Sequence, residues 1–473
     1  MLLFRLVFVV VFCFTAIFAE DEILSIDDVS VFESDFFSTI NIDDWKASSV
    51  NQRQIIVDDF LSKKLFVFDA KSLGLENGVG FQVKKRNRGE FLLLSEFYEN
   101  TVVKPLVTDV LLEKTKKNLI VDKHVYQILI GYKGCKMKGD FSLSKEDAKQ
   151  LSKAVYKQLL GGGDFKSLVL KYSSDPLSKH KEGDMGWVSW GRWVPAFQDK
   201  VYSLGINSYG SPLLTDFGFH ILIVTEEKPS EHLKLSSEDF SKLSFKYARN
   251  IVAPLFKAKK TEVDMGLIEA FGFKVNNVAV DKIELSLLKK NGPVSQTNVS
   301  AFLSGLENIG SVFVIKEKGF GVLWLVEQLK KIPASYRPQL SSRVDVENLI
   351  HNLALQHIAS TTGFELGLEK TISYSNKLSE FADDLLYKSY YKKLKTEKPV
   401  VSENKTKDYY NNNIDKFSKE GVLLPFEDVK SKIKQSLSTT SLEDYKKTVL
   451  QNLKLKYNVV INTSLFTLKK ENK

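Results

Sequence analysis

The residue types that could do chemistry gather between residues 119 and 229, around an aromatic-rich segment. Residues 183–197 read GDMGWVSWGRWVPAF and hold three of the five tryptophans of the chain. Such a segment is compatible with a packing cluster, a binding surface or the wall of a catalytic pocket. Two polar residues in the same region stand out: Asp175 directly precedes a proline, and His220 follows Gly-Phe in an apolar run. Each also has a purely structural interpretation, Asp175 as a turn residue and His220 as a satisfied core histidine.

Conventional catalytic and cofactor patterns are missing from the sequence. The six histidines are scattered and no His or Cys pair has metal-ligand spacing, so neither a metal nor a cofactor is expected. There is no GxSxG nucleophile elbow and no GxxxxGK[ST] phosphate loop, and the glycines at 161–163 follow a helical pattern, which favours a turn. No zinc-finger spacing or basic-aromatic run points to nucleic acid.

The elements that must position these residues form a β-α-α-loop-α-β pattern. Two strands so far apart in sequence must meet through the intervening helices, which predicts a compact α+β domain. The expected elements are strands over His124–Ile130 and Phe219–Val224, and helices over Lys145–Leu160, Asp164–Tyr172 and Phe197–Leu204.

Four motifs in this region together resemble a parvulin-type peptidyl-prolyl isomerase domain. They are YSSDP (172–176), GDMGW (183–187), VPAF (194–197) and SPLLTDFGFHILIV (211–224), in the family's order and at its spacing. The resemblance implies a small antiparallel sheet flanked by helices. It also implies cis–trans isomerisation of X-Pro peptide bonds without a cofactor.

The resemblance assigns polar roles to four residues. Asp175 falls where parvulins place a Cys or Asp facing the prolyl peptide, and Thr215 and His220 fall on the polar network behind it. Gln127 falls where the family usually has a histidine, which is a departure and leaves open a domain that binds without catalysis. His124 lies three residues earlier, on the opposite face of an extended strand, and is not expected to substitute.

The resemblance also assigns an apolar pocket. Met185, Trp193 and Phe197 fall on the wall that receives the proline ring. Trp187 is expected to pack inward, and Trp190 to lie at the rim or on the surface.

These residue types suit the reaction. Rotation about an X-Pro bond has a barrier of about 18–20 kcal/mol, because amide resonance must be broken. An apolar pocket can hold the ring while placed donors stabilise the twisted amide. Gln127 can donate a hydrogen bond but does not titrate near neutral pH.

The N-terminus predicts export. Arg5 precedes an apolar run over Leu6–Phe18, and Ala19 is followed by three acidic residues, which is typical of a signal peptide cleaved after residue 19. An uncleaved membrane anchor is the alternative. Cleavage would leave Cys135 as the one thiol, so no internal disulfide is expected, and a bacterial envelope compartment, the periplasm, fits best. The net charge of +9 is dispersed and predicts at most a weak attraction to anionic lipid or acidic clients.

The length of 473 residues predicts more than one domain. The expected sections are a signal peptide (1–19), an N-terminal helical chaperone region (20–118), the parvulin-like domain (119–230), a degenerate parvulin-like region (231–340) and a C-terminal helical region (341–473). A closing strand is expected over Tyr457–Phe466. The stretches AKSLGLE (70–76) and FGFKVNNVAV (271–280) resemble, more loosely, envelope chaperones of the SurA, PrsA and PpiD type.

Residues 207–229 and 308–333 form an internal echo. Both run Asn, Gly-Ser, a spacer, Gly-Phe, an apolar stretch expected to be a strand, Glu and then Pro. The second copy has Gly321 where the first has His220.

Three functions remain open on the sequence. The first is an exported isomerase with a helical chaperone module that binds unfolded or nascent polypeptides. The second is a non-catalytic holdase that keeps the fold for peptide binding, which Gln127 favours. The third, a structural or surface-binding envelope protein, would need repeats or an adhesive region, and the sequence has neither.

Overall fold

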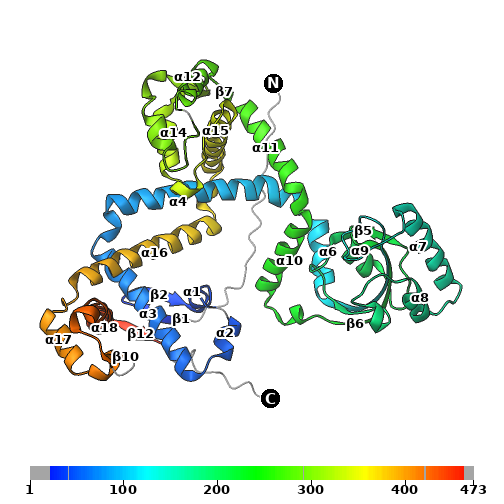
Figure 1. The fold of residues 1–473 in the computed structure, drawn as a ribbon, viewed down its shortest axis with the longest axis horizontal. Helices are drawn as coiled ribbons and strands as arrows, with labels where there is room; N and C mark the ends of the chain where they lie inside the picture. Colours follow the sequence, from blue (N-terminus) through cyan, green and yellow to red (C-terminus); the bar gives the residue numbers. More distant parts are fainter. Residues whose placement is uncertain (1–21, 41, 291, 420–421, 463–473) are drawn as a thin grey trace. The chain divides into compact units, whose positions relative to one another are not determined.

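A computed structural model describes residues 22–40, 42–290, 292–419 and 422–462 (Figure 1). The chain divides into two compact units, one made of residues 1–92 with 370–473 and one of residues 93–369. The expected signal peptide lies outside the described residues. Within the described part, no helix has both the length and the apolar character needed to cross a membrane.

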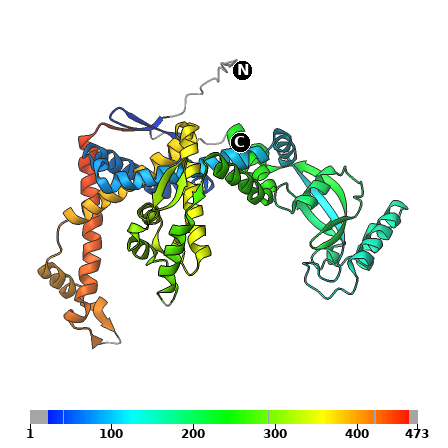
Figure 2. The ribbon, with the colours of Figure 1, turned by 90° about the horizontal axis from the view of Figure 1, so that it is seen from above.

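The first unit is built from both ends of the chain. Its N-terminal hairpin pairs with the last described strand, so that the sheet order is β12-β1-β2, with Leu24 opposite Ile461 (Figure 2). The closing strand is therefore confirmed over Val459–Ile461, and residues 463–466 of that prediction lie outside the described part. The elements of this unit are β1 (Glu22–Ile26), β2 (Val29–Phe32), α1 (Glu33–Phe37), α2 (Ile42–Ala47), α3 (Val50–Ser72), α16 (Ile372–Glu397), α17 (Glu403–Asn411), β10 (Ser418–Lys419), β11 (Val422–Leu423), α18 (Phe426–Lys456) and β12 (Val459–Ile461).

A buried carboxylate joins three helices of the first unit. Asp69 of α3 is 5% exposed and accepts hydrogen bonds from Tyr390 of α16 (2.9 Å) and Tyr457 after α18 (2.5 Å). Lys456 pairs with the same carboxylate at 2.7 Å. Burial opposes ionisation, but these three partners hold the pKa of Asp69 below its ordinary value.

The boundaries between the two units, after residues 92 and 369, differ from the section boundaries expected from the sequence, after residues 118 and 340. Helix α4 (Val79–Tyr98) crosses the boundary at residue 92, and α15 (Arg343–Glu365) belongs to the second unit although a C-terminal region starting at 341 was expected. The reason is packing: Phe97 and the buried face of α15 share one apolar core with α12 (Asn277–Leu288).

The parvulin-like part of the second unit is a four-stranded antiparallel sheet with the order β4-β3-β6-β5. Helices α7 and α8 cover one face and α9 covers the other, which confirms the α+β prediction. The strands β4 and β5 were not predicted, and β4 lies inside the segment expected to be a loop. The elements of this four-stranded domain are β3 (Val121–Ile130), α7 (Lys145–Leu160), α8 (Phe165–Tyr172), β4 (Asp184–Val188), α9 (Pro195–Ser203), β5 (Leu213–Thr215) and β6 (Gly218–Pro229).

Another part of the second unit, separate from the apolar cluster in which α5, α6 and α10 pack, centres on a three-stranded sheet, β7-β8-β9. Here the predicted second apolar strand is wrong: β9 ends at Gly321 and helix α14 follows at once. The residues buried along α14 recur at helical spacing and pack against α15. The remaining elements are α5 (Lys104–Leu106), α6 (Asp109–Leu119), α10 (Ser237–Val252), α11 (Phe256–Ala270), β7 (Lys274–Val275), α13 (Val299–Ser304), β8 (Ser311–Ile315), β9 (Lys318–Gly321) and α14 (Val322–Lys330).

Candidate active site

Gln127 and His220 lie on the sheet face covered by α9. Strands β3 and β6 are antiparallel, with Gln127 opposite Leu222, so His220 is its diagonal neighbour on the same face. The side chains meet, with His220 Nδ1 3.0 Å from Gln127 Oε1. Both are buried, at 3% and 6% exposure.

Asp175 reaches this pair because the preceding serines fasten its segment to β3. The Leu129 N–H donates to Ser173 Oγ at 3.2 Å, and the Ser174 N–H donates to the Leu129 carbonyl at 2.6 Å. The next residue, Asp175, then accepts a hydrogen bond from Gln127 Nε2 at 2.8 Å. Gln127 of β3 and Asp175 of the loop after α8 thus form one buried hydrogen bond, although they are far apart in the sequence.

The Asp175 carboxylate is held by its own loop. Its oxygens accept from the Leu177 N–H (3.1 Å), the Ser178 N–H (3.2 Å) and the Ser178 hydroxyl (2.5 Å). Burial acts against ionisation, but these donors and Gln127 keep the pKa of Asp175 below its ordinary value. Sequence reasoning missed Ser178; its signal is the spacing of three residues after an Asp in DPLS, a common local turn pattern.

The charge on Asp175 fixes the direction of the whole network. An ionised carboxylate can only accept, so Gln127 turns its NH₂ group towards Asp175 and its carbonyl towards His220. His220 therefore carries its proton on Nδ1, and its Nε2 accepts from the Thr215 hydroxyl at 2.7 Å. Thr215 Oγ1 in turn accepts from the Phe217 N–H at 3.1 Å. Every donor from Thr215 to Asp175 points the same way along the chain.

His220 is neutral in this arrangement. Burial lowers the pKa of its imidazole to about 4, an effect that the charge of Asp175 opposes only in part. A neutral ring with one acceptor and one donor nitrogen matches the hydrogen bonds made by Thr215 and Gln127.

An apolar wall stands beside the network. The Phe197 ring, at the start of α9, meets the His220 ring edge-on with centroids 5.4 Å apart. The Trp193 ring lies 5.3 Å from Phe197 at 32°, and Met185 packs against the same cluster. Phe197 is buried, whereas Trp193 is 38% exposed. All seven residues singled out on the sequence thus lie on or beside one face of one sheet.

Comparisons with known proteins match the region of the sequence that contains this site. Residues 110–228 match the sequence family described as the PPIC-type PPIase domain. Over 151 residues, which are 31% of this chain and 54% of the relative, the chain is 32% identical to Foldase protein PrsA of Geobacillus sp. (strain WCH70). Over 114 residues, 24% of each chain, it is 36% identical to Chaperone SurA of Methylobacillus flagellatus. The chain carries a parvulin-type peptidyl-prolyl isomerase domain.

Solved structures are similar to parts of the chain. The crystal structure of the peptidylprolyl isomerase PrsA from Bacillus anthracis aligns at 20% identity over 44% of this chain and 89% of that chain, with a TM-score of 0.26. A PpiC-type isomerase domain aligns at 18% identity over 24% of this chain and 97% of that one, with a TM-score of 0.21. The matched region spans about half the length of the PrsA relative, so it represents only part of such a protein.

Two tryptophans of the isomerase domain have the reverse of their expected environments. Trp187, expected inside, is 38% exposed, and Trp190, expected at the surface, is 1% exposed. In strand β4 side chains alternate, and Val188 takes the core face, which turns Trp187 outward against His124 and Lys228. Trp190, beyond the strand, packs edge-on against Tyr202 with ring centroids 5.0 Å apart.

His124 lies outside the polar network of the isomerase domain. Its ring contacts Thr225 at 3.2 Å and Asp184 at 3.3 Å. Among the residues that the structure describes, no group of three or more His, Cys, Asp or Glu side chains is arranged to hold a metal ion.

Proposed function

We propose that this protein is an exported folding factor that binds unfolded or nascent polypeptides and catalyses cis–trans isomerisation of their X-Pro bonds. One observation carries the proposal: a directed hydrogen-bond network from Thr215 to the buried Asp175 lies beside an apolar wall, in which Phe197 is buried and Trp193 is partly exposed. The similarity to proteins named foldase and chaperone supports the wider role in folding.

In the proposed reaction the proline ring rests on Met185, Trp193 and Phe197. Transfer out of water disfavours the planar amide, which is the more polar, charge-separated form. The Asp175 carboxylate adds to this effect, because a negative charge near the substrate carbonyl opposes the build-up of charge on its oxygen that planarity requires. No bond to the enzyme forms or breaks. His220, Thr215 and Gln127 act by holding the carboxylate in place and ionised.

The test is isomerisation of a short X-Pro peptide by the full chain. We expect catalysis above the uncatalysed rate, and losses on the order of 10²-fold in kcat/KM for Asp175→Ala and for His220→Ala. His180→Ala serves as a control, because this exposed histidine follows the same loop and its hydrogen-bond partner is the Pro176 carbonyl, 2.9 Å from Nδ1, rather than a member of the network. A folded wild-type protein without any rate above background would overturn the proposal.

A non-catalytic holdase is the second candidate, and Gln127 favours it. A holdase would suppress aggregation of an unfolded client equally well with Asp175→Ala and His220→Ala. The variant Gln127→His separates the two functions: a large gain in isomerisation would mean that the natural site is weakened, while an unchanged or lower rate would favour glutamine as a working member of the network.

We further propose that the protein is exported to a bacterial cell envelope compartment, the periplasm, after cleavage following Ala19. The basis is the pattern of Arg5, the apolar run and the acidic residues after it. N-terminal sequencing of the mature protein tests this: a first residue of Glu20 is expected, and an intact Met1 would support a membrane-anchored form instead.

A further inference from the structure

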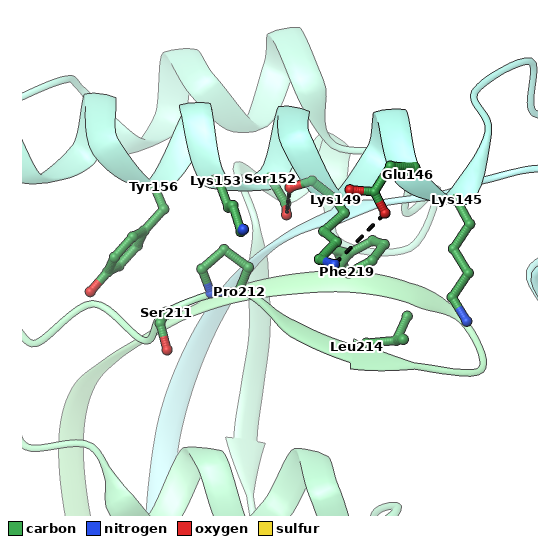
Figure 3. A pocket seen from close by; sticks show the side chains of 10 residues that line it. All are labelled: Lys145, Glu146, Lys149, Ser152, Lys153, Tyr156, Ser211, Pro212, Leu214 and Phe219. Atoms are coloured by element: carbon green, nitrogen blue, oxygen red, sulfur yellow. Dashed lines mark hydrogen bonds and ion pairs between the residues drawn. The ribbon is translucent and has the colours of Figure 1, made fainter.

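A groove lies on the other side of the isomerase sheet, between helix α7 and the β5–β6 hairpin (Figure 3). Its volume is about 690 Å³. Strand β6 alternates its side chains, so Phe219 faces α7 while the neighbouring His220 faces α9. Leu214 of β5 lines the groove, and the adjacent Thr215 bonds to His220. The sheet itself therefore separates the groove from the candidate active site.

One wall of the groove is basic. Lys145, Lys149 and Lys153 stand at successive four-residue steps of α7 and extend towards the hairpin in Figure 3. The lining has one carboxylate, Glu146, which pairs with Lys149 at 3.7 Å. Lys145 lies over the Tyr132 ring at 5.6 Å, and in the described part of the chain no ion pair involves Lys153.

One acidic and two basic side chains lie near the groove without lining it. Asp216, in the β5–β6 turn, is paired with Lys136 at 2.7 Å. On the hairpin side, Lys200 donates to the lining residue Ser211 at 2.9 Å and adds positive charge. The groove as a whole thus has more lysines than carboxylates.

The floor of the groove is apolar, and its edge can pair with a strand. Pro212, Leu214 and Phe219 form the floor. Strand β5 is the edge of the four-stranded sheet, so one side of it has no strand beside it in the described domain. An edge of this kind can pair with an added extended peptide.

The spacing of the lysines matches an extended chain. Four residues of α-helix rise about 6 Å. Two residues of β-strand advance about 6.6 Å, and alternate side chains share a face. A strand along α7 would therefore bring every second side chain to a lysine, while its other side chains face away from that wall.

We propose that this groove binds an extended acidic segment of a client polypeptide, with Asp or Glu at alternate positions and apolar residues between them. This second client site rests on the proposed function and adds a substrate class to it, namely client segments that do not have to contain a proline. Charge complementarity and the apolar floor favour a peptide over a lipid headgroup, which would leave the floor and the strand edge unused.

The test is fluorescence anisotropy of the full chain with a labelled, proline-free decapeptide that alternates Glu with Leu or Val. We expect saturable binding, and the double variant Lys149→Ala/Lys153→Ala should weaken it at least tenfold. The matched control is Lys157→Ala/Lys171→Ala, which removes the same charge from α7 and α8 at lysines outside the groove, and should change Kd less than twofold. A further variant, Leu214→Ser, alters an exposed floor residue and should also weaken binding.

The outcomes separate this site from the isomerase site. Groove variants should leave isomerisation of a short X-Pro peptide unchanged, and Asp175→Ala should leave binding of the acidic peptide unchanged. Equal losses in the groove and control variants would overturn the proposal, because binding would then follow net charge alone. Phosphatidylglycerol vesicles serve as a competitor. If they displace the peptide, and their own binding requires Lys149 and Lys153, the proposal is overturned in favour of a lipid surface.

Discussion

The two copies of the sequence echo fold differently after the same Gly-Phe pair. In the first copy, β6 continues through His220 to Pro229 as the longest strand of its sheet. In the second copy, β9 stops at Gly321 and the apolar residues that follow form α14. Similar composition has therefore produced a strand in one place and a helix in the other.

The difference lies in residue type and period. After Phe219 the sequence HILIVT is rich in β-branched residues, and it lies between β3 and β5. After Phe320 the sequence GVLWLVEQLK contains good helix formers, and its buried residues recur at helical intervals. The strand brings His220 next to Gln127 and Asp175, whereas the helix has no equivalent polar contact at Gly321.

Truncation of one leucine in each copy should have the largest effect and the clearest contrast. Leu222 of β6 is fully buried, so Leu222→Ala should lower the free energy of unfolding by about 3 kcal/mol. Leu323 of α14 is 51% exposed, so Leu323→Ala should cost less than about 0.5 kcal/mol. Hydrogen exchange of each segment, measured at increasing urea concentration, gives the change in the free energy of unfolding for both variants. Equal losses would show that the copies bury these positions alike.

Acid should destabilise the first copy alone. The pKa of His220 is about 4 in the folded protein, and about 6.5 in an unfolded chain. The unfolded state therefore binds more protons than the folded state between these two pH values. The neutral His220 accordingly contributes about 3 kcal/mol to the free energy of unfolding above pH 6.5, and this contribution is lost as the pH falls towards 4. The protection factors of residues 218–229 against hydrogen exchange, which correct for the intrinsic slowing of exchange in acid, should fall over this range, and those of 318–330 should not. His220→Gln, which cannot titrate, should flatten the response; an unchanged slope would exclude His220 as its source.

Two equally exposed tryptophans test the apolar wall that lies beside His220 of the first copy. Trp193→Ala should lower kcat/KM for an X-Pro peptide about tenfold, because Trp193 contacts Phe197 and lies beside the network. Trp187→Ala should leave kcat/KM unchanged, because Trp187 faces His124 and Lys228 instead. A similar loss in both variants would indicate that the segment acts through stability rather than through substrate contact.

Placing a histidine at the corresponding position of the second copy, Gly321, should have the smallest effect. Gly321 has an extended backbone, with φ of −94°, and a side chain there would begin at van der Waals distance, 3.4 Å from the Gly310 carbonyl. Gly321→His should therefore change stability by less than about 0.5 kcal/mol. In a His220→Ala background it should restore no isomerisation, since residue 321 lies in the sheet β7-β8-β9 and not in the sheet that holds Gln127. Any rescue measured in the peptide assay would contradict this.

Much of the isomerase domain could be predicted from the sequence. Helix α7 has the predicted bounds, Lys145 to Leu160, because a serine cap and a glycine end mark it. The strands β4 and β5 were missed, because one is short and the other lies in a glycine-rich segment whose extended form depends on pairing with β3. The resemblance of the motifs to a family identified the four network residues, but it did not identify Ser178, which donates to Asp175.

The sequence by itself determined the local elements and the residue types of the candidate site, because capping, periodicity and motif spacing are written along the chain. The tertiary structure decided which side chains meet. Sheet register made His220 the diagonal neighbour of Gln127, and two serines bonded to β3 carried Asp175 to the same point. It also decided that Trp190 is buried and Trp187 exposed, because the face that a side chain takes depends on which strand and helix lie across from it.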